Sequence, residues 1–257
     1  FRLRVALKVV KRGIDTDFVL RRFRNERQIL AALDHPFITR LIDGGTTPDG
    51  RPYFVMEYID GQTLYRYCDK KRLSINERLE LFCRVCEAVE YAHEKQIIHR
   101  DLKPSNIFVT NDGMPRLLDF GIAKLLDPEM ASDTLQPTAT ALRMMTVDYA
   151  SPEQVRGEKG TYATDVYSLG VILFELLTGR RPYKLKSRSP HDVARAICDD
   201  EPVMPSVAVG SSDPDLASVK VNPSAATLAG LVKPQRESPG QMSEQLRGNL
   251  DNIILKA

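Results

Sequence analysis

The sequence predicts an α+β fold in which a small sheet carrying one helix is followed by a larger, mainly helical part. Strand-like apolar runs with a turn between them are concentrated before residue 58. Long segments with helical spacing of apolar residues, 74–95 and 165–178, come after it. With 257 residues, the chain can bury a substantial core, as one large domain or as two lobes.

The first expected element is a strand at residues 5–10, VALKVV. Five apolar residues surround Lys8, and Gly13 ends the run. Such a run is typical of a buried strand, where an unpaired ammonium group is costly to desolvate. Lys8 is therefore expected to have a partner.

A helix and a hairpin are expected next. In residues 17–33, DFVLRRFRNERQILAAL, one helical face is expected to hold the apolar side chains of Phe18, Phe23, Ile29, Leu30 and Leu33. Residues 37–58 then hold two apolar runs around a turn rich in Gly, Pro and Asp. This pattern predicts a β-hairpin, so the first part should be a small sheet with one helix.

The second part is expected to be mostly helical. Residues 74–95 have a strong helical pattern, and two short strands, IFV and RLLDF, follow around the turn signal NDG. Residues 165–178 are apolar on most sides, which predicts a buried helix. Residues 202–245 are rich in Pro, Ser, Ala and Gly, so a long flexible insertion is expected there.

Composition excludes several classes of protein. The net charge of +2 is too small to indicate nucleic-acid or lipid binding through bulk charge, and neither a membrane span nor a signal peptide is expected within these residues. Four cysteines are few for this length, which fits a reducing compartment. Cys83 and Cys86 have CxxC spacing but lie in a helical pattern without a second pair. They are interpreted as core-side helix residues and not as zinc ligands.

Four short motifs follow one another: VALK at 5–8, HRDLKPSN at 99–106, DFG at 119–121 and SPE at 151–153. Each alone could occur by chance, but in this order and spacing they resemble the eukaryotic-type (Hanks-type) protein kinase family over nearly the whole chain. The resemblance implies one two-lobed α+β kinase domain, with a partial N-lobe at 1–58 and a C-lobe at 59–257. It also implies ATP and Mg²⁺ as cofactors.

The resemblance assigns the phosphate-binding lysine to Lys8 and its ion-pair partner to Glu26, which lies 18 residues later near the apolar helix face. An ordinary exposed helix glutamate is the alternative for Glu26. Residues expected to bind the adenine are Ala6, Met56, Glu57, Ile59 and Phe108. Residues expected to form an apolar column between the lobes are Leu30, Leu41, His99 and Phe120.

In the second lobe, Asp101 resembles the catalytic base that orients the substrate hydroxyl and accepts its proton. Asn106 and Asp119 resemble the ligands of Mg²⁺. Lys103, two residues after Asp101, is typical of serine/threonine kinases, and Thr146 matches a family threonine with the same implication. Residues with implied structural roles are His99, Arg100, Phe120, Gly121, Glu153 and Asp165.

The segment 119–153 resembles an activation loop. Arg100 resembles the arginine that pairs with a phosphate on this loop, since a guanidinium group fits phosphate oxygens well. Regulation by loop phosphorylation is therefore expected, although an unmodified polar loop has the same composition. The candidate sites are Thr134, Thr138, Thr140 and Thr146.

The sequence departs from the family pattern at three places. SPE replaces the commoner APE, a small-for-small change that still allows Glu153 to form an ion pair. The glycine-rich loop expected before VALK is absent, and the chain ends before the arginine that usually meets Glu153. The catalytic domain is therefore expected to be truncated at both ends.

The resemblance is strongest to bacterial receptor-like serine/threonine kinases. The implied function is transfer of the ATP γ-phosphoryl group to Ser or Thr of protein substrates. Self-association of two copies for trans-autophosphorylation is also implied. A cytoplasmic location is expected, with any membrane contact made by a segment outside this chain.

Three other readings stay open at this point. A pseudokinase-like binding module usually lacks one of the residues that correspond to Lys8, Asp101 and Asp119, and all three are present here. A small-molecule phosphotransferase is disfavoured by the long activation segment and by SPE. The third is an inactive fragment, because the glycine-rich loop is missing.

Overall fold

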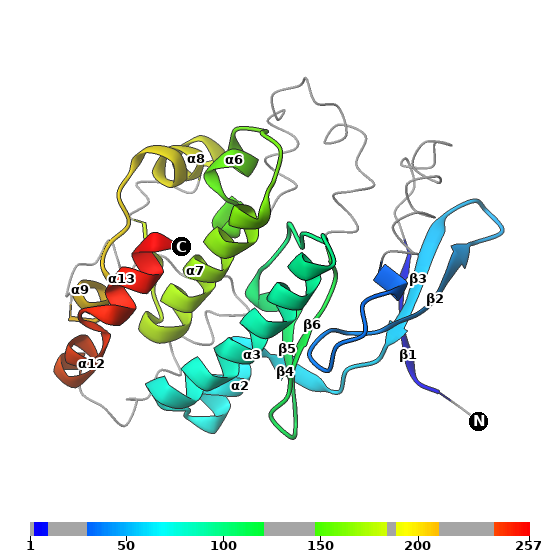
Figure 1. Cartoon of the computed structure of the whole chain (residues 1–257), viewed down its shortest axis with the longest axis horizontal. Helices are drawn as coiled ribbons and strands as arrows, with labels where there is room; N and C mark the ends of the chain where they lie inside the picture. Colours follow the sequence, from blue (N-terminus) through cyan, green and yellow to red (C-terminus); the bar gives the residue numbers. More distant parts are fainter. Residues whose placement is uncertain (1–2, 10–29, 121–146, 184–188, 211–238) are drawn as a thin grey trace.

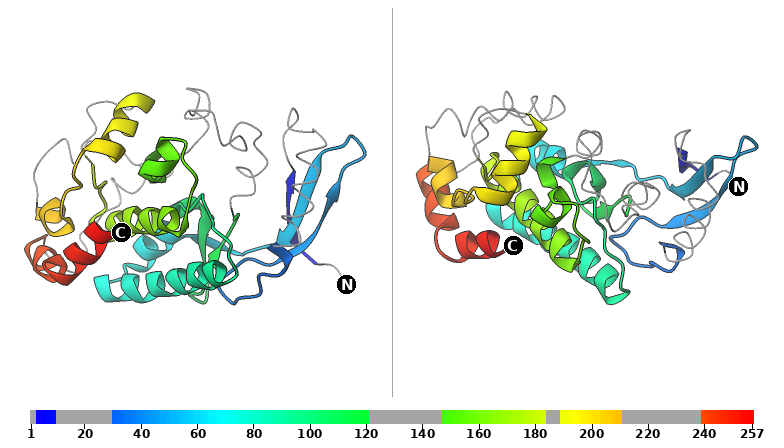
Figure 2. Two further views of the ribbon diagram at one scale, coloured as in Figure 1. Left: turned by 45° about the horizontal axis from the view of Figure 1, so that its top comes forward. Right: turned by 90° about the horizontal axis from the view of Figure 1, so that it is seen from above.

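A computed structural model of the chain describes residues 3–9, 30–120, 147–183, 189–210 and 239–257. A small sheet lies at one end of the molecule, and the helices gather at the other (Figures 1 and 2). The predicted α+β fold class, with two lobes of unequal size, is confirmed.

Three antiparallel strands form the sheet at the N-terminal end. They are β1 (Val5–Val9), β2 (Leu41–Thr46) and β3 (Pro52–Glu57), in the order β1-β3-β2. The hairpin predicted between residues 37 and 58 is confirmed as β2 and β3. Lys8 pairs with Phe54 of the central strand, and Phe54 is fully buried.

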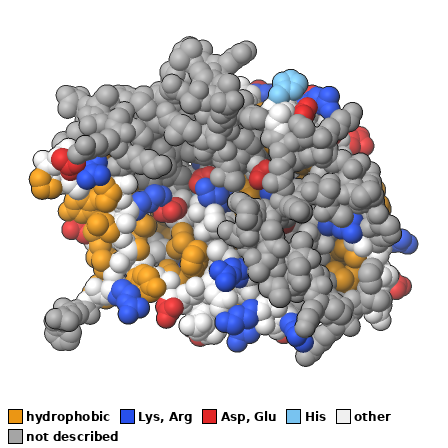
Figure 3. Space-filling view, turned by 180° about the vertical axis from the view of Figure 1, so that it is seen from behind, with side chains coloured by type: hydrophobic (Ala, Val, Ile, Leu, Met, Phe, Trp, Pro, Cys, Tyr) orange, Lys and Arg blue, Asp and Glu red, His pale blue; other side chains and the backbone are white. Residues whose placement is uncertain are grey.

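β1 is not the buried strand that its composition predicts. Its side chains alternate between exposed and half-buried, and Leu7 is 62% exposed. The reason is position: among the described strands, β1 lies at an edge of the sheet, and apolar composition alone does not distinguish an edge from a central strand. Figure 3 shows hydrophobic side chains gathered on the surface at this end of the molecule.

A second antiparallel sheet contains β4 (Gly61–Thr63), β5 (Ile107–Thr110) and β6 (Pro115–Leu117), in that order. β5 and β6 are the two short strands predicted around the NDG turn. Gly113 in this turn has a φ of +85°, a conformation that glycine adopts without steric cost.

The two sheets are connected through residues 37–39. The Leu117 N–H donates to the Phe37 carbonyl at 2.7 Å, and the Thr39 N–H donates to the Leu117 carbonyl at 3.0 Å. Ile38 and Leu117 thus form an isolated parallel bridge. This bridge fixes the end of β6, which leads directly into Asp119.

Two long helices form the centre of the second part. α3 (Ile75–Glu94) matches the helix predicted at 74–95, and Ser74 caps it in a reciprocal capping box with Glu77. α7 (Tyr162–Thr178) contains the buried helix predicted at 165–178 and begins three residues earlier. It ends at Gly179, whose φ is +67°.

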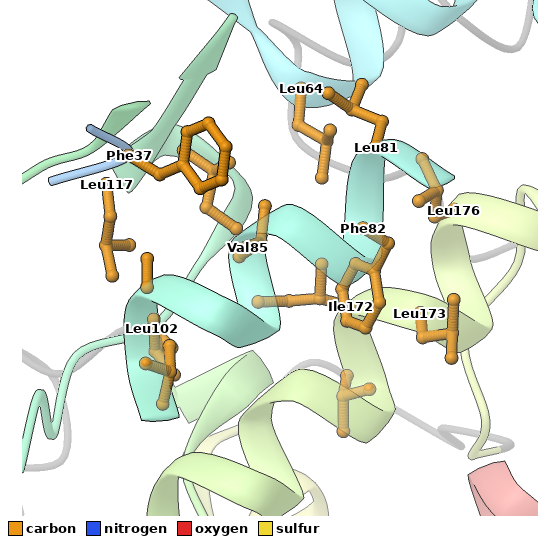
Figure 4. Packing of buried hydrophobic residues seen from close by; sticks show 14 of the residues in the cluster. Phe37, Leu64, Leu81, Phe82, Val85, Leu102, Leu117, Ile172, Leu173 and Leu176 are labelled. Atoms are coloured by element: carbon orange, nitrogen blue, oxygen red, sulfur yellow. The ribbon is translucent and has the colours of Figure 1, made fainter. Parts of the chain in front are cut away.

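The hydrophobic core lies where α3 and α7 pack together. In Figure 4, Phe82 and Val85 of α3 face Ile172 and Leu176 of α7. The same buried cluster continues to Leu117 at the second sheet, so the core joins the helices to the strand that precedes Asp119.

The remaining described helices are α2 (Leu64–Lys71), α6 (Pro152–Val155), α8 (Pro190–Asp199), α9 (Pro205–Gly210), α12 (Pro239–Leu246) and α13 (Asn249–Lys256), with two short 3₁₀ helices, η1 (Pro104–Asn106) and η2 (Val147–Tyr149). The prediction of a loose insertion over the whole of 202–245 was wrong at both ends, because α9 and α12 lie there. Asp251 of α13 stabilises the first turn of α9, because its carboxylate accepts hydrogen bonds from the Ser206 N–H at 2.9 Å and from Ser206 Oγ at 2.6 Å. The middle of the stretch, 211–238, lies outside the described residues.

Other sequence-based predictions are met only in part. The helix predicted at 17–33 lies mostly outside the described residues, but Leu30 and Leu33 at its end are buried. Cys86 of α3 is half-buried as predicted, whereas Cys83 is exposed. All four cysteines of the chain are free thiols. Among the described helices, none combines the length and apolar character needed to cross a bilayer.

Candidate active site

Asp165 anchors the loop that carries the HRD motif. It lies in the first turn of α7 and is fully buried. Its carboxylate accepts hydrogen bonds from the backbone N–H groups of His99 and Arg100, each at 2.8 Å, and lies 2.8 Å from His93 Nε2. A buried carboxylate needs such donors, so the loop and the first turn of α7 are held together.

Arg100 has a left-handed backbone with a φ of +62°. For a residue other than glycine this conformation is strained, at a cost of about 1–3 kcal/mol, and it persists only where the surroundings fix it. Here both sides of the residue are fixed, because Asp165 accepts its N–H and Gln154 Nε2 donates to its carbonyl at 2.8 Å. The next residue in the chain is Asp101, whose side chain is half-buried.

The Asp101 carboxylate is half-buried among polar groups. Lys103 Nζ lies 2.8 Å from Asp101 Oδ2. Asn106 Nδ2 donates to the Asp101 carbonyl at 2.9 Å and lies 3.3 Å from Oδ2. The structure thus brings together three of the predicted catalytic residues, and the amide oxygen of Asn106 is an atom that can act as a ligand.

Asp119 lies across from the first sheet. Lys8 Nζ of β1 is 3.0 Å from Asp119 Oδ2, with the two side chains 36% and 28% exposed. The partner found for Lys8 is therefore Asp119. Asp119 has a φ of +52°, and its Oδ1 is buried with no hydrogen-bond partner among the described residues. A buried carboxylate oxygen without a donor is suited to a bound cation.

His99 links the two acids through the backbone. It is fully buried, its Nε2 lies 2.9 Å from the Leu118 carbonyl, and its ring contacts Phe120 at 4.7 Å between centroids. Burial lowers the pKa of His99, with Asp165 acting in the opposite direction. The neutral ring then donates from Nε2 to Leu118 and accepts the Asp101 N–H at Nδ1, 3.3 Å away.

The predicted adenine-side residues of the first sheet lie on neighbouring strands. Ala6 of β1 pairs with Met56 of the central strand β3. Leu41 of β2, predicted for the apolar column between the lobes, also pairs with Met56. Ala6 and Met56 are half-buried. Leu41 packs against the buried cluster that contains Leu30 and Phe120.

The other predicted adenine-side residues follow β3 or lie in β5. Glu57 ends β3, and its N–H donates to the Arg40 carbonyl at 3.0 Å. Ile59, two residues later, is half-buried. Phe108 is half-buried in β5, the strand that follows Asn106.

Glu153 has a partner other than the expected arginine. It is half-buried in α6, and its carboxylate accepts from Thr164 Oγ1 at 2.6 Å. In the described part of the chain Glu153 thus contacts a hydroxyl of α7, and its ion pair with an arginine stays a prediction.

Several predicted site residues lie outside the described part of the chain. They are Glu26, Gly121, Thr134, Thr138, Thr140 and Thr146.

Sequence reasoning missed a second group of polar residues next to the site. Tyr149 lines a small cavity together with Asp101 and Lys103. Its hydroxyl donates to Glu175 of α7 at 2.7 Å, and Arg181 lies beside both. A signal was present, because Glu175 and Asp165 are the only charged residues in the otherwise apolar sequence of α7.

Comparison with known proteins agrees with this geometry. A family model described as "Protein kinase domain" matches residues 2–229. The serine/threonine-protein kinase PknB of Mycobacterium tuberculosis is 39% identical over 255 residues, which cover 97% of this chain and 38% of PknB. PknB of Mycolicibacterium smegmatis is 40% identical over 221 residues, covering 84% of this chain and 34% of that protein. The chain thus spans only about a third of the length of these relatives.

Solved structures show the same likeness. The Mycobacterium tuberculosis PknI kinase domain superposes with a TM-score of 0.52 at 30% identity, over 69% of this chain and 65% of that one. A mutant of the same domain superposes with a TM-score of 0.57 at 25% identity, over 98% of this chain and 86% of that one.

Proposed function

Because the chain belongs to the protein kinase domain family, we propose that it is the catalytic domain of a serine/threonine protein kinase. It transfers the γ-phosphoryl group of ATP to Ser or Thr hydroxyls of protein substrates. The observation that carries the proposal is the constellation of Asp101, Lys103 and Asn106 in mutual contact, with Asp119 paired to Lys8 nearby. The names of the PknB relatives support the serine/threonine class.

Asp101 is the group that orients the substrate hydroxyl and takes up its proton. Its place on a loop fixed by Asp165 and Gln154 supplies the positioning that phosphoryl transfer requires. Lys103, 2.8 Å from the Asp101 carboxylate, is placed to stabilise the negative charge that develops on the transferred group.

Asp119 and Asn106 are the residues that would hold Mg²⁺. The fit rests on the buried, unpartnered Oδ1 of Asp119 and on the amide oxygen of Asn106. No group of three or more His, Cys, Asp or Glu side chains suited to a metal occurs in the described part of the chain. A small number of protein ligands is typical of Mg²⁺ sites, because the ion keeps several bound waters. Bound together with ATP, Mg²⁺ would neutralise phosphate charge.

Lys8 and the adenine-side residues Glu57 and Ile59 would position ATP. From β1, the Lys8 ammonium can reach the phosphates while it stays close to Asp119. A second ion pair with Glu26 is part of the proposal, as are adenine contacts from the Glu57 carbonyl and from Ile59. Phosphorylation of Thr or Ser in the segment 132–146 would regulate the site through Arg100.

The test uses Asp101→Asn, Asp119→Asn and, as a matched control, Asp200→Asn at an exposed position at the end of α8. The full-length gene product is incubated with ATP, Mg²⁺ and a generic basic protein. Asp101→Asn should reduce transfer by roughly 10²–10⁴-fold. Asp119→Asn should abolish transfer, because a neutral amide holds a divalent cation poorly, and the control should match the wild type.

Circular dichroism and thermal melting should show that all three variants keep the fold. Phosphate should appear on Ser and Thr only. Turnover of Asp119→Asn within a few-fold of the wild type would remove Asp119 from the metal role, and phosphate found only on tyrosine would contradict the proposed substrate class.

A further inference from the structure

A buried cluster of polar side chains lies directly beneath the candidate site. Glu175, near the end of α7, has a side chain that is only 2% exposed. Its Oε2 accepts from Tyr149 at 2.7 Å and from Tyr65 at 2.9 Å, while Arg181 Nε lies 3.1 Å from its Oε1. The last two atoms are poorly aligned for a hydrogen bond, so this contact is an ion pair.

Arg181 joins this acid to a second one. Its side chain is 8% exposed, and it holds Asp148 of η2 with both ends of the guanidinium group: Nη1 lies 2.8 Å from Oδ1, and Nη2 lies 2.9 Å from Oδ2. The guanidinium carbon also lies 5.4 Å from the centre of the Tyr149 ring. One arginine therefore contacts α7, Asp148 and the ring that follows Asp148 in the chain.

The charges of the cluster depend on one another. Burial raises the pKa of Glu175, and Arg181 acts against this rise. Although burial alone would lower it, Glu175 and its neighbours raise the pKa of Arg181, which stays charged. Burial and Glu175 together raise the pKa of Tyr149, so its hydroxyl keeps the proton that it donates.

Two links carry the position of this cluster to the catalytic loop. Tyr149 lines the small cavity beside Asp101 and Lys103. Five residues later, Gln154 donates to the Arg100 carbonyl at 2.8 Å. Tyr149, Ala150 and Gln154 thus form one wall of the cavity beside Asp101. Arg181 holds Asp148, the residue directly before this wall. Because Asp101 is the residue proposed to orient the substrate hydroxyl, this wall borders the proposed substrate site.

We propose that Arg181 is a positioning residue for the protein substrate: through its two-ended contact with Asp148 and its ion pair with Glu175, it fixes Tyr149 and the wall of the cavity beside Asp101. This inference rests on the proposed kinase function. Arg181 itself need not touch the substrate or ATP. Its loss should therefore weaken the use of protein substrate while leaving the use of ATP nearly unchanged.

The first variant is Arg181→Met, which keeps an apolar stem and removes the guanidinium group. Because it leaves Glu175 buried without its cation, and such an acid is strongly penalised, the double variant Arg181→Met/Glu175→Gln is measured with it. The double variant removes the unpaired charge of Glu175 but still lacks the contact of the guanidinium group with the Asp148 carboxylate. Arg247→Met, an exposed arginine between α12 and α13, is the matched control.

Steady-state kinetics of the full-length gene product should show a KM for a Ser/Thr peptide that rises roughly 10-fold in both Arg181 variants, since small displacements of bound groups have effects of this size or larger. The KM for ATP should stay within about twofold, and Arg247→Met should match the wild type. Arg181→Lys, which keeps the charge but not the two-ended contact, should restore the peptide KM only in part.

Hydrogen exchange supplies a readout that does not depend on phosphoryl transfer. Amides of residues 148–155 should exchange roughly 10-fold faster in the double variant than in the wild type, with α3 unchanged. Unchanged exchange in 148–155, an unchanged peptide KM, or an equal rise in both KM values would overturn the positioning role. If exchange accelerates as expected while the wild type transfers no phosphate to Ser or Thr, the proposed function fails. Arg181 then only holds the segment 148–154 in place, and its role toward a protein substrate is overturned.

Discussion

His99 shows how one buried side chain connects both acids of the site. Its ring contacts the N–H of Asp101 on one side and the carbonyl of Leu118 on the other. Leu118 is the residue directly before Asp119, so His99 connects the backbone at both acids. Only the neutral ring can make both contacts, since one nitrogen must accept while the other donates. The lowered pKa of His99 is thus consistent with its hydrogen bonds.

The lowered pKa leads to a prediction about stability and pH. Above the ordinary value of 6.5, His99 is neutral in both the folded and the unfolded chain. As the pH falls below 6.5, the unfolded chain binds a proton that the folded chain does not take up until its own lower pKa is reached. The free energy of unfolding should therefore decrease with falling pH in that window, by up to about 1.4 kcal/mol per pH unit from this residue.

Urea unfolding of the wild type and of His99→Gln between about pH 5 and 7.5 checks this prediction. The variant should be less stable at pH 7.5 and should show a shallower pH dependence. His191→Gln is the control, because the His191 side chain is 88% exposed, and it should keep the slope of the wild type. Equal slopes in all three proteins would contradict a neutral, buried His99.

At the scale of elements, glycines at two helix termini allow a matched comparison. Gly179 ends α7 with a φ of +67°, and Gly240 lies in the first turn of α12 with ordinary helical backbone. A methyl group added at either position meets nothing within 4 Å. Any difference between the two alanine variants must therefore come from the backbone conformation and not from packing.

We expect opposite signs for these variants. Gly179→Ala should lower the free energy of unfolding by about 1 kcal/mol, because alanine is strained in the left-handed region. Gly240→Ala should raise it by about 0.5 kcal/mol, because alanine restricts the unfolded chain and favours the helix. Denaturant titrations measure both. A loss of stability at Gly240 equal to that at Gly179 would show that conformation does not control the effect.

Elements with a regular pattern could be predicted from the sequence, and those that depend on neighbours could not. The helix from Ser74 follows from its capping box and its apolar spacing, and the hairpin before Glu57 follows from its turn. The exposure of Leu7 could not be predicted, because the sequence of a strand does not show whether the strand lies at the edge or in the centre of a sheet. The helix α9 could not be predicted either, because its first turn is held by Asp251, which lies 45 residues from Ser206 in the chain.

The same distinction holds for the site. Asp101, Lys103 and Asn106 lie within six residues of one another, so their motif predicts that they meet. The contacts of Arg181 with Asp148 and Glu175 combine residues from separate elements, and no short motif contains them. Charged residues within the apolar sequence of α7 were the one signal available.

At the scale of the whole molecule, helix α7 contacts the site through two acidic residues, one near each end of the helix. Asp165 in its first turn holds the catalytic loop, and Glu175 near its last turn holds Tyr149 through a hydroxyl contact. Ten residues separate them along the helix, which corresponds to about 15 Å. The two acids share no hydrogen-bond partner in the described part of the chain, so we expect their contributions to the free energy of unfolding to be independent. The hydrogen bond from Gln154 to the Arg100 carbonyl links the positions of the two segments without direct contact between the two acids.

A double-mutant cycle of Asp165→Asn and Glu175→Gln tests this independence. Asp165→Asn should cost about 1–3 kcal/mol, since an amide cannot replace both acceptor oxygens and leaves a buried donor unmet. Glu175→Gln should also destabilise, because it removes a negative partner of the buried Arg181. Sites this far apart usually combine additively within about 0.5 kcal/mol. Unfolding free energies of the two single variants and the double variant measure the coupling, and a value well above 0.5 kcal/mol would mean that the catalytic loop and the segment 148–154 respond as one unit.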